Sequence, residues 1–235
     1  MTQGLPLFPL GTVLFPGLVL PLHIFEDRYR ALVRHLTALP EGATREFGVV
    51  AIRRGWEVQA ASLPTDRPAT SASLTLYDIG CTAELRQVTE HADGRFDVVT
   101  VGRRRFQITS VDRDSQPYLT ADVRWLPEPD GAGAAAADLL APRVLALFRR
   151  YLALLRPESG EVGEQLPDDP TVLSHVVAAT AALTVDDRQR LLAAPDTATR
   201  LRGELRLLSR EAALLRQVRA VPVPLADLAA PASPN

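Results

Sequence analysis

Short apolar runs separated by turn residues cover the first 126 residues, and this pattern predicts a β-rich region. Two early runs, Val13–Phe15 and Leu18–Leu22, are separated by Pro16-Gly17, a pair typical of tight turns. Later runs predict further strands at Phe47–Ile52, Leu85–Thr89, Arg95–Thr100, Phe106–Val111 and Leu119–Trp125. Many short strands at this spacing favour a closed or sandwiched β-domain.

One helix is expected to interrupt these strands. Apolar residues recur at helical spacing between residues 25 and 36, namely at Phe25, Tyr29, Leu32, Val33 and Leu36. Two acidic residues, Glu26 and Asp27, lie in the first turn, where they interact favourably with the helix dipole. We expect this helix to cover an open end of the β-domain.

The apolar pattern changes to a helical period after LPEPDGAGAAAA, a Pro-, Gly- and Ala-rich segment that predicts a linker over residues 127–138. Beyond it, Asp169-Pro170, Thr184 and Asp196-Thr197 each provide the N-cap of a helix. The chain therefore divides into a β-domain (1–126), the linker, a helical bundle (139–220) and a Pro- and Ala-rich tail (221–235) that is expected to be flexible. The predicted fold class is α+β.

All 26 basic residues are arginine, and this narrows the range of possible functions. A Walker A phosphate loop, a Schiff-base enzyme and a serine–lysine hydrolase all need a lysine, so these sites are excluded. The net charge of −2 is spread evenly along the chain, whereas nucleic-acid binders usually carry a basic excess. The charge balance therefore argues against nucleic acid as a partner.

The cysteine content and the apolar segments indicate the cellular compartment. Cys81 is the single cysteine, so the chain can form no intramolecular disulfide. The apolar N-terminal segment is interrupted by four prolines, and no run reaches the roughly 18 apolar residues that a membrane span needs. We therefore expect a cytoplasmic protein with no membrane contact.

Candidate catalytic and metal-binding groups are sparse. The histidines His23, His35, His91 and His175 fall in different predicted elements without a partner at metal-ligand spacing, so no metal site and no cofactor are expected. His23 lies in an apolar stretch and is interpreted as a core histidine bonded to the backbone, with a ligand or base as the alternative. Ser174 and His175 are neighbours on a helix, where successive side chains diverge. No catalytic residue and no enzymatic activity are predicted.

The long polar segment between Arg53 and Tyr77 is the candidate binding site, because loops of this length are commonly functional. An aromatic side chain lies among charged residues there, and the predicted binding residues are Arg53, Arg54, Trp56 and Tyr77. A tryptophan packed back onto the β-domain is the alternative for Trp56.

Two arginine-rich features have structural interpretations. Arg103–Arg105 is expected in a hairpin connection, with its side chains paired to nearby acids rather than bound to phosphate. The last helix, Arg200–Arg219, carries a leucine stripe that is expected to pack on neighbouring helices rather than on a membrane or in the groove of a partner.

Six segments of the chain carry a resemblance to a known family. They are LPLFPLGTVLFPGLVLPLHIFEDRYRALV (Leu5–Val33), FGVVAI, IGCTAELRQV, DGRFDVVTVGRRRFQI, PYLTADVRWLPE and, in the helical part, LTVDDRQRLLAAPDTATRLRGELRLL. Together they resemble the N-terminal substrate-binding domain of the Lon protease family over residues 5–215.

This resemblance implies that residues 1–126 form a PUA-like β-barrel with one covering helix, followed by a C-terminal helical bundle. In the family, an ATPase module and a serine–lysine protease module follow this region. Neither module's essential lysine occurs here, so we expect a stand-alone relative without catalysis. The motif residues are interpreted as fold-defining, with the aromatic rings filling one end of the barrel: Phe8, Pro9, Phe15, Pro16, Gly17, Pro21, Phe25 and Tyr29.

The hypothesis that follows is a non-catalytic polypeptide-binding module, an adaptor in protein quality control. Its expected partners are unfolded or tagged polypeptides and an ATP-dependent protease. RNA or small-ligand binding through the PUA-like barrel is the alternative, and an unrecognised hydrolase is a third hypothesis.

Overall fold

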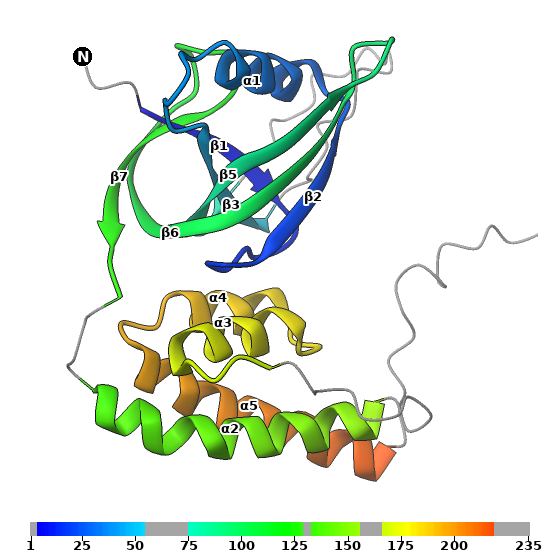
Figure 1. Ribbon diagram of the computed structural model, residues 1–235, viewed down its shortest axis with the longest axis vertical. Helices are drawn as coiled ribbons and strands as arrows, with labels where there is room; N and C mark the ends of the chain where they lie inside the picture. Colours follow the sequence, from blue (N-terminus) through cyan, green and yellow to red (C-terminus); the bar gives the residue numbers. More distant parts are fainter. Residues whose placement is uncertain (1–3, 55–74, 129–132, 156–165, 219–235) are drawn as a thin grey trace, which may run out of the picture.

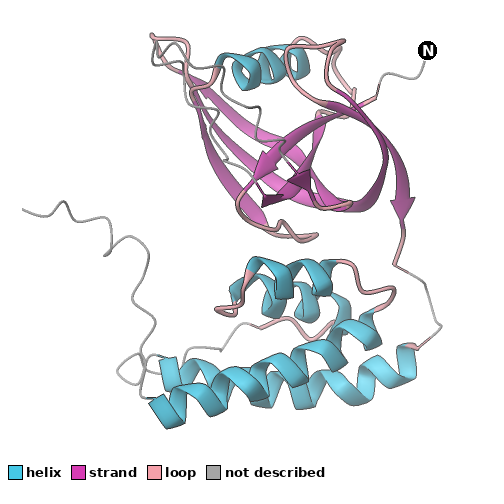
Figure 2. Cartoon of the chain, turned by 180° about the vertical axis from the view of Figure 1, so that it is seen from behind, coloured by secondary structure: helices cyan, strands magenta, loops and turns pink. Residues whose placement is uncertain are grey.

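The computed structural model describes residues 4–54, 75–128, 133–155 and 166–218. Within these ranges, strands and one helix form the upper layer in Figure 1, and four helices form the lower layer. Figure 2 shows the same two layers from behind. A mostly antiparallel sheet followed by helices confirms the predicted α+β class. The predicted tail (221–235) lies outside the described residues.

Five strands of the upper layer form a closed sheet. β1 pairs with β7 and with β3, and β6 and β5 complete the ring. β2 pairs with β6 and β4 pairs with β3, so both lie beside the ring. The strands are β1 Leu5–Leu10, β2 Val19–Ile24, β3 Glu46–Arg54, β4 Thr75–Leu76, β5 Ile79–Glu90, β6 Phe96–Asp112 and β7 Thr120–Leu126.

β6 is one continuous strand of 17 residues, and the predicted hairpin connection at Arg103–Arg105 was wrong. β5 pairs with one edge of this long strand, and two strands share the other edge, because residues 96–101 pair with β2 and residues 105–112 pair with β7. Gly102 lies between these two parts. A Cβ at this position would lie 2.1 Å from the carbonyl oxygen of Phe15, so the glycine allows a close approach of the chain.

The first two arginines of this segment pair with acids, as predicted. Arg103 Nε lies 3.0 Å from Glu84 Oε2, and Arg104 Nη2 lies 3.2 Å from Glu46 Oε2. Arg105 differs from them because its side chain is buried, and it connects the sheet to the helical layer.

Helix α1 (Asp27–Thr37) covers one end of the closed sheet, as the sequence predicts (Figure 1). Its apolar face is buried through Leu32, Val33 and Leu36. Tyr29 stacks on Phe8 of β1 with 4.1 Å between the ring centroids, which fixes the helix against the strand.

The lower layer consists of α2 (Ala134–Leu155), α3 (Pro170–Thr180), α4 (Val185–Leu192) and α5 (Thr197–Val218). α2 begins inside the segment that was expected to be a linker, because its run of alanines has high helix propensity. The predicted leucine stripe of α5 packs inward, since Leu201, Leu208 and Ala212 are buried. No helix in the described ranges is both long and apolar enough to cross a membrane.

The predicted helix starts are confirmed by their side-chain caps. Asp169 Oδ1 accepts a hydrogen bond from Val172 N–H at 2.8 Å, and the Thr184 hydroxyl accepts one from Asp187 N–H at 3.1 Å. At the start of α5, Asp196 Oδ1 accepts from the N–H three residues later at 2.7 Å.

Polar contacts hold the sheet against the helices. Arg105 Nη1 donates to the carbonyl oxygens of Leu192 and Ala194 at 2.8 and 2.6 Å, at the C-terminal end of α4. This end carries the negative pole of the helix dipole, so the cation is well placed. Gln189 Nε2 donates to the carbonyl oxygen of Ile79 in β5 at 2.7 Å. The junction is therefore built from specific hydrogen bonds.

A buried ionic cluster lies at the same junction. Glu128 Oε1 lies 2.5 Å from Arg200 Nη2, 3.1 Å from Arg105 Nη2 and 3.4 Å from His175 Nε2. Burial raises the pKa of Glu128, but His175 and the two guanidinium groups outweigh this effect and lower it to about 2. Burial lowers the pKa of His175. Glu128 is therefore the anion that balances two buried cations.

Candidate functional site

β2 is an edge strand, and one side of its backbone has no strand partner among the described residues. Gly102 N–H donates to Leu18 O at 2.8 Å, and the β2–β6 register continues from there without a break. Because backbone groups alternate in an antiparallel pair, those of the even-numbered residues face β6 and those of Val19, Pro21 and His23 face away. Proline has no N–H, so the free edge offers two donors and three carbonyl acceptors.

Beside this edge, β2 and β1 are not paired with each other, and a gap separates them. β1 pairs with β7 only through Leu5 and Pro6, so its residues 8–10 have, within the described ranges, no strand neighbour on the side of β2. A hollow of about 200 Å³ lies there, between Phe8–Leu10 of β1, the segment Leu22–Glu26 and Tyr29 of α1. Its wall is mainly apolar, which suits an apolar side chain.

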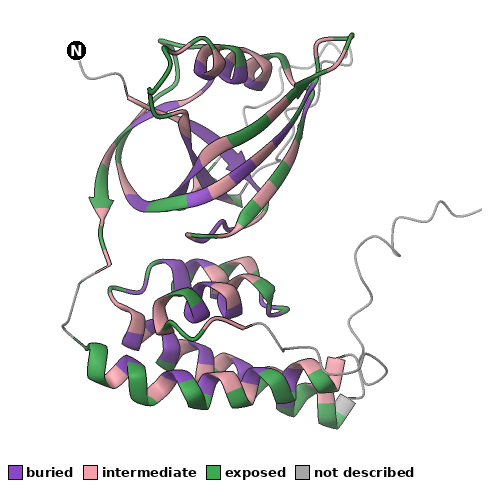
Figure 3. Cartoon of the chain, in the orientation of Figure 1, coloured by how far each residue is buried: buried purple, intermediate pink, exposed green. Residues whose placement is uncertain are grey.

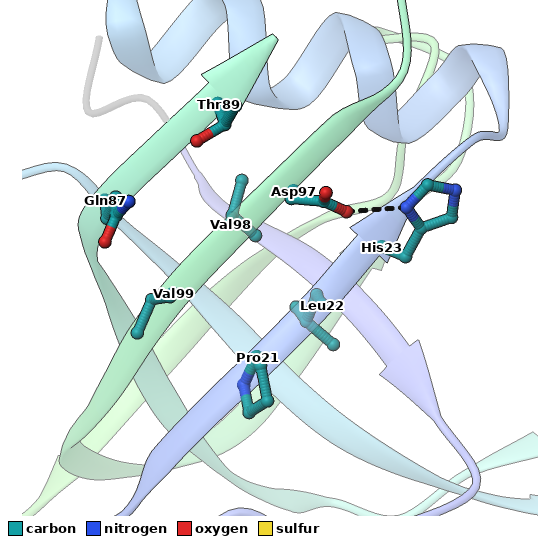
Figure 4. A pocket seen from close by; sticks show the side chains of 8 residues that line it. All are labelled: Pro21, Leu22, His23, Gln87, Thr89, Asp97, Val98 and Val99. Atoms are coloured by element: carbon teal, nitrogen blue, oxygen red, sulfur yellow. Dashed lines mark hydrogen bonds and ion pairs between the residues drawn. The ribbon is translucent and has the colours of Figure 1, made fainter. Parts of the chain in front are cut away.

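A second hollow, of about 280 Å³, lies on the outer face of β2, β6 and β5 (Figure 4). Pro21 and Val99 supply apolar surface, and Gln87 supplies a polar amide. Leu22 and His23 line both hollows, so the two hollows flank β2. We call the free edge of β2, the two hollows, Val19 and Phe25 the β2 surface.

Two apolar side chains on this surface are exposed to solvent. Val19 is 62% exposed and Phe25 is 49% exposed. The prediction that Phe25 fills an end of the barrel was therefore wrong, whereas Phe8, Phe15 and Tyr29 are buried as expected. Phe25 follows the last residue of β2, and its half-exposed ring is stacked near that of His23 with 6.3 Å between the ring centroids. Figure 3 shows β2 alternating between exposed and half-buried residues.

His23 lies on the solvent side of β2, and the interpretation as a core histidine was wrong. Its side chain is 46% exposed, and Nδ1 lies 2.6 Å from Asp97 Oδ1. The other oxygen of Asp97 lies 2.7 Å from His91 Nε2. The hydrogen bond to His23, followed by that to His91, lowers the pKa of Asp97. Sequence spacing could not reveal this group, because strand pairing brings the three residues together.

Two of the four binding residues predicted from the sequence lie together elsewhere. The guanidinium of Arg53 lies over the ring of Tyr77, 5.6 Å from its centroid, and both line a hollow of about 580 Å³ that also contacts α4. The Tyr77 hydroxyl donates to the carboxylate of Asp186, and this bond raises the pKa of Tyr77. The side chain of Arg54 and the whole of Trp56 lie outside the described residues. A binding role for these four residues stays a prediction.

Ser174 and His175 have structural surroundings. The Ser174 hydroxyl donates to the Thr171 carbonyl oxygen at 2.8 Å and accepts from Arg200 Nη1 at 2.9 Å. His175 is buried and faces Glu128. The two side chains thus take part in the junction between the layers.

Comparisons with known proteins identify relatives of this architecture. The chain is 30% identical over 213 residues to Lon protease 2 of Herpetosiphon aurantiacus, which covers 89% of this chain and 24% of that protein. It therefore spans about a quarter of the length of this curated relative.

Two solved structures share the fold. The N-terminal domain of a Mycobacterium avium complex Lon protease matches with a TM-score of 0.62 and 22% identity, over 88% of this chain and 98% of that one. The Lon N-terminal domain protein from Xanthomonas campestris matches with a TM-score of 0.53 and 24% identity, over the same shares of the two chains. The sequence model of the ATP-dependent protease La (LON) substrate-binding domain matches residues 4–210. The chain belongs to this LON substrate-binding domain family.

Proposed function

We propose that the chain is a polypeptide-binding module that adds extended segments as a strand to the free edge of β2. The edge itself is the observation that carries this proposal. Among the described residues, the backbone groups of Val19, Pro21 and His23 on this edge have no strand partner; one hollow lies beside the edge, and the other lies on the outer face of β2, β6 and β5. Unpaired strand edges are established templates for binding an extended chain.

Strand addition suits a module that accepts many sequences. Hydrogen bonds to the backbone of Val19 and His23 do not depend on which side chains the bound segment carries. Successive side chains of a strand point to opposite faces, so a bound segment can direct one set of side chains towards the hollow beside β1 and the other set towards the exposed outer face of β2. The exposed side chains of Val19 and Phe25 add apolar contact area.

The charge of the described surface favours polypeptide over RNA as the ligand. The outward arginines of β6 are already paired, Arg103 with Glu84 and Arg104 with Glu46. The net charge of the whole chain is −2. Phosphate binding usually draws most of its affinity from unneutralised cations, and neither Arg103 nor Arg104 is one.

Family membership supports a specific cellular role for this binding. The family is named for substrate binding in an ATP-dependent protease, and the relative from Herpetosiphon aurantiacus is a Lon protease. We therefore propose that the chain acts in the cytoplasm as an adaptor in protein quality control. In this role it would bring unfolded or tagged polypeptides to an ATP-dependent protease.

Fluorescence anisotropy with a dye-labelled casein, an unfolded polypeptide, tests the binding mode. Val19→Pro removes an N–H that faces away from β6, whereas Val19→Ala retains this N–H and removes only the side-chain methyl groups. We expect Val19→Pro to weaken casein binding about tenfold or more, because it removes a donor and blocks the edge. We expect Val19→Ala to weaken it by less than about threefold.

Two controls distinguish strand addition from loss of the fold and from RNA binding. Circular dichroism checks that both variants keep the fold. An unlabelled single-stranded RNA is added as a competitor at low and at physiological salt. Equal casein affinity for Val19→Pro and Val19→Ala would contradict strand addition. Displacement of casein by RNA at physiological salt would favour the RNA alternative.

A further inference from the structure

His23, His91 and Asp97 form a cluster of potential metal ligands on a rigid frame. The β2–β6 register places His23 directly opposite Asp97. His91 lies in the turn between β5 and β6, which is closed by hydrogen bonds from His91 N–H to Arg95 O and from Gly94 N–H to His91 O, both at 2.8 Å. In the described part of the chain, no other group of three such side chains brings its ligand atoms within 4.8 Å of one another.

The donor set and its spacing suit a transition-metal ion. Zinc binds imidazole nitrogens and carboxylate oxygens at about 2.0–2.2 Å, so its tetrahedral ligands lie roughly 3.3–3.6 Å apart. The Asp97 oxygens lie 2.6 and 2.7 Å from the two imidazole nitrogens, and the ring centroids of His23 and His91 lie 6.1 Å apart. Small rotations of three exposed side chains therefore open the group to the zinc geometry.

We propose that His23, His91 and Asp97 bind one divalent transition-metal ion, with Zn²⁺ as the ion best suited to the site. The carboxylate now accepts a hydrogen bond from each imidazole. When the ion binds, each of these hydrogens moves to the other nitrogen of its ring, and the freed nitrogen ligates the ion together with the carboxylate. Three protein ligands leave a fourth position for water. Mg²⁺ and Ca²⁺ prefer oxygen ligands and are disfavoured, because two of the three donors are imidazoles.

The bound ion would connect three separate segments. β2, β6 and the β5–β6 turn each contribute one ligand, so binding stabilises the folded state relative to the unfolded chain. Arg95 limits the affinity, because its Nη1 lies 3.4 Å from His23 Nε2 and its charge repels a cation. Replacing Arg95 with alanine should therefore strengthen zinc binding.

Isothermal titration of tag-free protein with zinc chloride tests the site, since a histidine tag would itself bind zinc. We expect one Zn²⁺ per chain, a rise in melting temperature with zinc, and no response to Mg²⁺. His23→Ala, His91→Ala and Asp97→Asn should each weaken binding more than about tenfold. His35→Gln and Asp114→Asn are the matched controls, and they should change the affinity by less than about twofold.

Folding of each variant is checked by its melting temperature without metal. All three ligands are exposed, so their replacement should leave the fold intact. A titration without saturable zinc binding would overturn the proposal. Binding that persists unchanged in His23→Ala, His91→Ala and Asp97→Asn would overturn it as well, because it would place the ion elsewhere.

Discussion

Glu128 is the single carboxylate that contacts both buried arginines at the junction of the two layers, among the residues that the structure describes. We predict that Glu128→Gln strongly destabilises the protein. The amide has nearly the same shape as the carboxylate but no negative charge. The guanidinium groups of Arg105 and Arg200, which are 3% and 0% exposed, would then lie close together without an anion. Removing one partner of a buried ion pair leaves an uncompensated charge, which is strongly destabilising.

The size of the effect follows from the pKa. Its surroundings hold the pKa of Glu128 at about 2, against an ordinary value of 4.5. This difference corresponds to about 3 kcal/mol in favour of the charged, folded form at neutral pH. Because the folded pKa is the lower one, this contribution is present above pH 4.5 and is lost as the pH falls towards 2. Glu128→Gln should therefore lower the free energy of unfolding by about 3 kcal/mol at pH 7.

Urea denaturation followed by far-UV circular dichroism measures this difference. Glu90→Gln is the matched control, because Glu90 is exposed and lies 3.7 Å from Arg34. It should change the free energy of unfolding by less than about 0.5 kcal/mol. The variant should also lose the part of the acid dependence that the wild type shows between pH 4.5 and 2. A loss below about 1 kcal/mol for Glu128→Gln would refute the assignment of Glu128 as the required counter-ion.

Three further predictions concern buried groups of the two layers. Burial raises the pKa of Glu204 well above its ordinary value of 4.5, so the free-energy cost of keeping this carboxyl buried grows as the pH rises above 4.5. In urea denaturation, Glu204→Gln should therefore stabilise the protein more at pH 8 than at pH 5. An effect of the same size at both pH values would contradict this. Gly102→Ala should lower the free energy of unfolding by about 1–3 kcal/mol, because the added Cβ would meet the carbonyl oxygen of Phe15. An unchanged midpoint of urea denaturation would disprove this close approach. Burial raises the pKa of Cys81 to about 12, so a thiol reagent at pH 8 should label it only after unfolding in guanidinium; rapid labelling of the native protein would show that the thiol is accessible.

The features that the sequence predicted correctly are those with local physical causes. α1 follows from the spacing of Tyr29, Leu32 and Leu36, and the starts of α3 and α4 follow from the capping residues Asp169 and Thr184. A cap and a helical period depend on residues within a few positions of one another. They can therefore be recognised without knowledge of the tertiary structure.

The features that were missed depend on contacts between distant segments. β6 continues through Arg103–Arg105 because it changes neighbour from β2 to β7, and no local signal records such a change. His23 lies in an apolar stretch, but the odd-numbered side chains of β2 lie on the outer face of the sheet and are exposed to solvent. Phe25 fits the helical period of α1, but the helix begins two residues later and leaves its side chain exposed.

The free edge of β2 could have been suspected from Pro21. Proline inside a strand is largely confined to edges, because it cannot donate a hydrogen bond to a neighbouring strand. The sequence alone does not show which strand would lie beside this edge. Only the pairing of β2 with β6 and the incomplete pairing of β1 with β7 reveal that the edge faces a hollow.

Hydrogen–deuterium exchange of the backbone amides, with and without saturating unfolded casein, tests the account most directly. The amides of Val19 and His23 face away from β6, so they should exchange rapidly in the free protein and slowly in the complex. Protection of these two amides on binding would support strand addition at β2. Unchanged exchange at both, with new protection confined to the hollow beside Arg53 and Tyr77, would contradict it and place the polypeptide there instead.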